Sequence, residues 1–230
     1  MLNITAIGAH PDDIEIFFYG TLAACRDRGD IISLVVATDG AAGGDEPGPA
    51  LAERRRIETE NGLARLGEPI MLDLPDGQLA EAADAAARLR DAVAETDPDL
   101  ILTHGPEDYH PDHRALSRLV ADIASFRCPI LLADTLMGVG FEPQFYVDIT
   151  AHAAEKHDAI MAHESQEPHR FARAAAIMNR YRAAQCNAPD DHRAEAWRVE
   201  NRFPFAEIRS LLPPSPPLRP FYIRGSNALI

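Results

Sequence analysis

The stretch "NITAIGAHPDDIEIFFYG", residues 3–20, decides the fold. Its first part, "NITAIGA" (3–9), is an apolar run of strand length. "IEIFFYGTLAACRDRG" (14–29) then places apolar residues at helical spacing and ends at a glycine. Between the two stand a histidine, a proline and two aspartates. The pattern predicts a buried strand, a turn that carries charge-capable side chains, and a helix.

Strands and helices alternate along the rest of the chain. Strands are predicted at 30–40, 69–74, 99–105, 129–135 and 144–150, and helices at 50–67, 82–96, 113–125, 151–164 and 169–186. Such alternation implies parallel strands joined by right-handed crossovers, with helices on both faces of the sheet. We therefore expect an α/β fold with a mostly parallel, doubly wound sheet.

The length is compatible with a single domain or with one domain plus a small appendage, and we expect one domain. The 230 residues, 46% of them hydrophobic, can bury one sizeable core. The tail "LLPPSPPLRPFYIRG" (211–225) is too rich in proline to be helical, so it is predicted to lie extended over the body or over a neighbouring subunit. A homo-oligomer is compatible with this second placement.

Charge and cysteine content exclude several classes of function. Lys and Arg total 22 against 36 Asp and Glu, a formal charge of -14, which argues against nucleic acid or an anionic membrane as partner. The three cysteines are far apart and form no CxxC pair, so we expect buried, reduced thiols rather than disulfides or a thiolate zinc site. No stretch of about 18 apolar residues and no signal-like N-terminus occurs, which predicts no membrane insertion and a cytoplasmic location.

Two similar motifs follow predicted strands. "AHPDD" (9–13) follows the first strand and "EDYHPDH" (107–113) follows the fourth. In a doubly wound sheet, ligands bind beyond the carboxyl ends of the strands, where both motifs lie. His10, Asp13 and His113 would supply two imidazoles and a carboxylate, the donor set of a catalytic zinc site with a position open for water. Asp12 is placed to accept a proton from that water. Helix capping by His10 and Asp13, and a third histidine ligand in His110, are the alternatives.

Five stretches carry a resemblance to a known family. "GAHPDDIEIFFYGTLA" (8–23), "TDG" (38–40), "LPDGQL" (74–79), "THGPEDYHPDHRA" (103–115) and the region from "VDIT" to "MAHESQ" (147–166) resemble signatures of zinc-dependent de-N-acetylases. These enzymes are related to N-acetylglucosaminylphosphatidylinositol deacetylase and are called PIG-L or LmbE-like. The resemblance implies a Rossmann-like sheet and the same zinc ligands. We expect residues 1–166 to form the deacetylase core, and residues 167–230 a helical and proline-rich extension of the same domain.

The resemblance also implies roles for residues that spacing does not assign. A protonated His110 would stabilise the oxyanion and Asp112 would orient it, although a helix-capping role for Asp112 stays open. Arg55, in "RRIE" (55–58), matches an arginine that holds substrate in relatives. Glu164, in "HESQ" (163–166), replaces a frequent arginine. The segments 40–50 and 167–230 are expected to decide the substrate.

The predicted function is zinc-dependent hydrolysis that removes an N-acetyl group from an amino sugar or related small glycoside, by attack of a zinc-bound water. Other divalent transition metals can occupy such a donor set. Alternatives within the enzyme class are an amidase for larger amides and a deformylase. A magnesium-binding phosphoacceptor or signalling module is disfavoured by His10 and His113, because magnesium prefers oxygen ligands. A catalytically silent sugar-binding protein would leave Asp12 and His110 unexplained.

Overall fold

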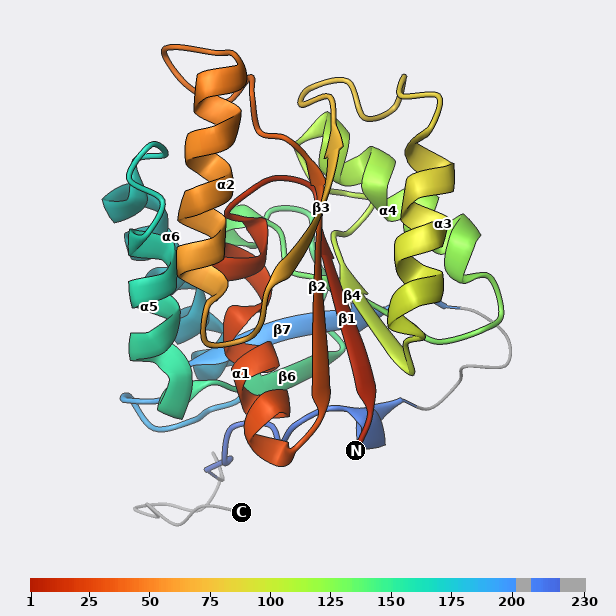
Figure 1. Ribbon diagram of the computed structural model, residues 1–230. Helices are drawn as coiled ribbons and strands as arrows, with labels where there is room; N and C mark the ends of the chain where they lie inside the picture. Colours follow the sequence, from red (N-terminus) through yellow and green to blue (C-terminus); the bar gives the residue numbers. More distant parts are fainter. Residues whose placement is uncertain (202–207, 220–230) are drawn as a thin grey trace.

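A seven-stranded sheet forms the centre of the protein (Figure 1). The computed structural model describes residues 1–201 and 208–219. In spatial order the strands are β3 (Pro69–Leu74), β2 (Ile31–Thr38), β1 (Asn3–Gly8), β4 (Leu100–Thr103), β5 (Ile130–Ala133), β7 (Ala194–Val199) and β6 (Phe145–Asp148). The first five run parallel, and β7 runs antiparallel to both of its neighbours. The predicted α/β class with a Rossmann-like, mostly parallel sheet is confirmed.

Helices cover both faces of the sheet, as predicted (Figure 1). One face carries α1 (Tyr19–Arg28), α2 (Pro49–Leu63), α5 (Ala153–Met161) and α6 (Pro168–Gln185); the other carries α3 (Ala85–Thr96) and α4 (Pro111–Ala124). The short helices are η1 (Ile14–Phe18), η2 (Leu136–Gly138), η3 (Thr150–His152) and η4 (Arg209–Leu211). Two hydrophobic cores result, one on each side of the sheet. Within residues 1–201 and 208–219, no helix combines the length and apolar character needed to span a bilayer.

The central strand β1 positions the first motif. All its residues except Asn3 are buried, and it pairs in parallel with β2 on one side and β4 on the other. Parallel strands bring their carboxyl ends to one edge of the sheet. The loops after β1, β2, β3 and β4 therefore meet at the top of Figure 1, opposite the N-terminus.

The helix predicted at 14–29 is divided in two. It begins with the π-helix η1 and continues as α1, with a break at Phe18, whose φ of -121° is not helical. A π-helix turn holds more residues than an α-helix turn and is frequent at functional sites. The far end of α1 is as predicted: Gly29 adopts a φ of 93° and donates to the Arg26 carbonyl.

The last strand, β7, is the main element that the sequence pattern did not predict. Its sequence "AEAWRV" contains alanine, glutamate and arginine, which favour helices, but Ala194 and Trp197 are fully buried between β5 and β6. Tertiary packing thus overrides local preference. The division between a core at 1–166 and an extension at 167–230 stays a prediction, although β7 shows that residues after 166 complete the sheet.

The described part of the proline-rich tail lies against the body. Residues 212–219 form neither helix nor strand, and the Pro214 carbonyl accepts a hydrogen bond from the Asp148 amide of β6 at 2.8 Å. Residues 220–225 of the predicted extended segment lie outside the described residues. The three thiols are free; Cys25 and Cys128 are buried as expected, whereas Cys186 is partly exposed.

Candidate metal centre

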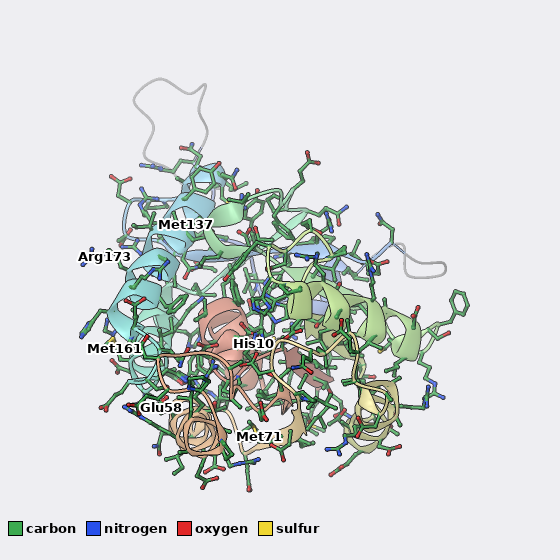
Figure 2. All side chains as sticks on the ribbon, turned by 90° about the horizontal axis from the view of Figure 1, so that it is seen from above. His10, Glu58, Met71, Met137, Met161 and Arg173 are labelled. Carbon is green, nitrogen blue, oxygen red and sulfur yellow. The ribbon has the colours of Figure 1, made fainter. Side chains whose placement is uncertain are left out.

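The loops at the carboxyl edge of the sheet enclose a pocket of about 160 Å³. Its polar lining comes from the loops after β1, β3 and β4 and from Arg55 of α2, His113 of α4 and Gln166 before α6. Phe17 of η1 and Phe171 of α6 contribute apolar surface. In Figure 2, which views the molecule from above, His10 lies near the middle, between the helices of the two faces. The pocket therefore occupies the place predicted for the site.

The three residues predicted to bind zinc meet inside this pocket. His10 Nδ1 lies 3.2 Å from His113 Nε2 and 3.3 Å from Asp13 Oδ2, and the last two atoms are 3.2 Å apart. Ligands arranged tetrahedrally at about 2.0–2.1 Å from a zinc ion lie about 3.3 Å from one another. The triangle of donor atoms therefore fits one such ion. Asp13 stands at the N-cap of η1 but makes no side-chain cap hydrogen bond, so capping does not explain its presence.

Neighbouring carboxylates fix which ring nitrogens face the triangle. His10 Nε2 lies 3.2 Å from both Asp112 Oδ2 and Asp76 Oδ1, and His113 Nδ1 lies 3.2 Å from Asp108 Oδ1. The His113 contact falls short of good hydrogen-bond alignment, although its distance is suitable. Carboxylates in this position hold a ligating imidazole in one tautomer and raise its basicity. Nδ1 of His10 and Nε2 of His113 are thereby left to bind a metal.

Carboxylates surround the two histidines of the triangle and raise their pKa values. Burial lowers the pKa of His10, but hydrogen bonds to Asp112, Asp13 and Asp76 raise it by more. The net pKa lies well above the usual value. Burial likewise lowers the pKa of His113, and Asp13 and Asp108 raise it to about 9. Both shifts come from the carboxylates that surround the two rings, so the triangle lies in surroundings that favour positive charge.

Asp12 is buried and held in an uncommon backbone conformation. Its φ of 118° is one that residues other than glycine rarely adopt, at a cost of about 1–3 kcal/mol, and such strain gathers at active sites. Burial raises the pKa of Asp12, and the nearby Arg55 lowers it, with a net value of about 6. A carboxylate that titrates near neutrality and lines the pocket has the properties of a general base.

Arg55 was expected to hold substrate, and the structure shows it engaged with the protein. Only 3% of its surface is exposed, and its guanidinium donates to the carbonyls of Gly40 and Pro11. Its Nη2 also lies 3.3 Å from Asp12 Oδ2. Arg55 still lines the pocket, but its contacts tie the glycine-rich loop after β2 to the backbone and side chain of the first motif.

The contacts of His110 favour a neutral ring, whereas the resemblance implies a protonated one, which stays a prediction. It is the N-cap of α4, and its Nδ1 accepts a hydrogen bond from the Asp112 amide at 3.2 Å. A ring nitrogen that accepts carries no proton, so Nε2 is the donor. Burial and the adjacent His10 and His113 lower the pKa of His110, consistent with a neutral ring. A neutral imidazole can still donate one hydrogen bond into the pocket.

Asp112 contacts His10 through its carboxylate, and its role of orienting His110 stays a prediction. Its carboxylate accepts from the amides of Gly77 and Leu79, at 2.7 and 3.1 Å, and faces His10 rather than His110. Only its backbone amide contacts His110, which itself caps α4. The structure therefore connects Asp112 to a candidate metal ligand, and through it the "LPDGQL" stretch to the site.

Three further site residues were missed in the sequence: Asp76, His104 and Asp108. His104 is 1% exposed, stacks on His113 with ring centroids 3.8 Å apart, and its Nε2 lies 3.1 Å from Asp13 Oδ2. With Asp13 and His113 it forms one group that could hold a metal, and His10, His110 and His113 form another. The position of His104 directly after β4 matches that of His10 after β1, a signal available in the sequence. Asp76 and Asp108 had no such signal in the sequence, because only the folded loops bring them next to His10 and His113.

Three residues of the "HESQ" stretch bind neighbouring elements, and one of them, Gln166, lines the pocket. His163 Nε2 lies 2.7 Å from Glu15 Oε1, Ser165 binds Glu58, and Gln166 donates to the Gly43 carbonyl. Glu164 instead points to solvent, with 79% of its side chain exposed and Arg54 at 3.8 Å. The substitution thus lies outside the pocket lining.

Fold and site together place a cluster of His and Asp side chains that could hold a metal at the carboxyl edge of a Rossmann-like sheet. Residues 5–124 match the family model described as GlcNAc-PI de-N-acetylase, or PIG-L. This match covers more than half of the chain, and the chain belongs to that family.

Individual relatives agree with this assignment. The chain is 29% identical to diacetylchitobiose deacetylase of Thermococcus kodakarensis over 188 residues, 72% of this chain and 70% of the relative. Among solved structures, N,N'-diacetylchitobiose deacetylase from Pyrococcus horikoshii superposes with a TM-score of 0.77 at 23% identity, covering 88% of this chain and 87% of the other. The 4-carboxy-2-hydroxymuconate hydratase GalB of Pseudomonas putida has the same TM-score at 19% identity, covering 90% and 100%. Fold alone therefore does not fix the reaction.

Proposed function

We propose that this chain is a zinc-dependent N-deacetylase that acts on an N-acetylated amino sugar or a related small glycoside. The observation that carries the proposal is the triangle of His10 Nδ1, Asp13 Oδ2 and His113 Nε2, whose sides of 3.2–3.3 Å suit one tetrahedral ion. A donor set with two imidazoles favours zinc or another transition metal over magnesium. The 29% identity to a diacetylchitobiose deacetylase supports the substrate class.

When bound, zinc would supply Lewis-acid chemistry, polarising an acyl carbonyl and lowering the pKa of water to about 7. Asp12 then accepts the proton of the attacking water, since its carboxylate is buried in the pocket and its pKa of about 6 suits this transfer. His110 donates through Nε2 to the oxygen of the former carbonyl. Asp12 returns the proton to the departing amine, and acetate and a free amine result.

The role of Arg55, the acyl group removed, the cellular location and the oligomeric state are further parts of the proposal. Arg55 would act on substrate chiefly by holding Asp12 and the loop after β2 in place. An amidase for larger amides or a deformylase would use the same residues. We further expect a cytoplasmic protein, and a homo-oligomer stays a prediction.

The test combines metal analysis with an amine-release assay. The purified chain is assayed for zinc and for free amine released from a panel of N-acetylated amino sugars, chitobiose derivatives and N-formyl analogues, with and without chelator. About one zinc per chain and chelator-sensitive release from acetylated sugars are expected. Release from the formyl analogues alone would replace the acetyl assignment. A zinc-loaded chain that releases no amine from any of them would refute amide hydrolysis.

A further inference from the structure

A buried ion pair behind the pocket joins α5 to β7. Lys156 Nζ lies 2.7 Å from Glu195 Oε1, and each residue is only 3% exposed. Removing two charges from water costs several kcal/mol per ion, so a buried pair is a poor means of gaining stability. Its contacts with the rest of the chain therefore need an explanation.

The carboxylate of Glu195 binds the beginning of α1. It accepts hydrogen bonds from the amides of Gly20 and Thr21, at 3.0 and 2.8 Å. The first amides of a helix have no partner within the helix, and an anion is favourable there. Trp197, two residues further along β7, adds a second connection, because its Nε1 donates to Thr21 Oγ1 at 2.9 Å. Strand β7 thus fixes where α1 starts.

The start of α1 is also the end of the π-helix that carries part of the candidate metal site. Asp13 is the N-cap of η1, and the Phe17 ring within η1 packs edge-on against His104 and His113, with centroids 5.6 and 6.1 Å away. One residue of helix corresponds to about 100° of rotation. If the junction at Phe18 shifted into a continuous α-helix, Phe17 and Asp13 would therefore turn away from the two histidines.

We propose that Glu195 is a positioning residue for the metal centre, with Lys156 holding its carboxylate in place. By binding the amides of Gly20 and Thr21, Glu195 keeps η1 in its π-helical register, which places Asp13 and Phe17 against His113. The inference rests on the metal site of the proposed function and is independent of which acyl substrate is hydrolysed.

The test separates positioning from a general contribution to stability. Glu195→Gln removes one of the two amide acceptors and the charge. Asp30→Asn is the matched control. Asp30 is also a buried carboxylate, it lies at the other end of α1, and it accepts hydrogen bonds from the Leu2 amide and the Arg28 side chain. Zinc affinity is measured by chelator competition, and the visible spectrum of the Co²⁺-substituted protein reports the coordination geometry. Both measurements are made where circular dichroism shows every variant folded.

We expect Glu195→Gln to bind zinc about tenfold more weakly, which is the lower end of what loss of a supporting contact costs a metal site. We also expect the Co²⁺ spectrum of this variant to change. Asp30→Asn should keep wild-type affinity and spectrum even if its Tm falls. A folded Glu195→Gln with both properties unchanged would overturn the proposal. Should that variant not fold, Glu195→Asp, which keeps the charge but withdraws it from the amides, carries the same expectation and the same refutation. A wild-type chain that binds zinc without releasing amine would refute the deacetylase function alone.

Discussion

Replacing Asp112 with alanine tests how the site is supported. The carboxylate, 2% exposed, accepts from Leu79 N, Gly77 N and His10 Nε2. Leu79 is buried, so its amide would lose its partner at a cost of about 1–3 kcal/mol, whereas water can replace the bond to the exposed Gly77. His10 would retain Asp76 at 3.2 Å, so its tautomer should persist.

From these contacts we expect Asp112→Ala to lower the free energy of unfolding by about 1–3 kcal/mol. Zinc affinity should fall about tenfold, the lower end of the range for such partners, because one supporting carboxylate remains. Urea denaturation of the metal-free chain measures the first quantity and chelator competition the second. The double variant with Asp76→Ala leaves His10 Nε2 without either carboxylate and should approach a hundredfold loss. A double variant that binds zinc as well as Asp112→Ala would refute the reasoning.

Three other predictions follow from the same structure. Asp12→Asn should keep zinc and lose about 10²–10⁴-fold in kcat, measured by metal analysis and amine release; wild-type turnover would remove Asp12 as the base. Gly20→Ala should destabilise the chain by about 1–3 kcal/mol in denaturant titrations despite the better helix propensity of alanine, because the new Cβ would lie 2.7 Å from Ile149; a gain in stability would show that Ile149 moves freely. Burial raises the pKa of Cys25 to about 12 and that of Cys128 to about 11, so at pH 8 an alkylating reagent should modify neither thiol until the chain is unfolded, as mass spectrometry would reveal.

The parallel part of the fold could be predicted because its signals are local. Apolar runs of strand length alternate with helical periodicity from β1 to β5, and the two His-Pro-Asp motifs mark where strands give way to helices. Strand β7 could not be predicted in this way, since only its place between β5 and β6 makes a strand of "AEAWRV". The π-helical turn of η1 likewise depends on Glu195, which is 175 residues away from Gly20.

In the candidate site, too, the residues within local motifs could be predicted, whereas their contacts could not. His10, Asp12, Asp13 and His113 stand in a recognisable motif pair, and the structure brings them together. The roles of the residues around this motif pair could not be predicted from the sequence, because they depend on which side-chain atoms face one another in the folded loops. The preference of His110 for a neutral ring follows from one amide hydrogen bond.

The position of β7 also has a consequence for the order in which the protein is made. Five strands of the sheet can pair soon after they leave the ribosome, but β6 has no neighbour until residues 194–199 have been synthesised, some 50 residues later. At about 5–20 residues per second, that interval lasts a few seconds. During it the edge of β5 is open and the start of α1 lacks its carboxylate partner. All residues that line the pocket, the last of which is Phe171, are therefore synthesised before the strand that binds the start of α1.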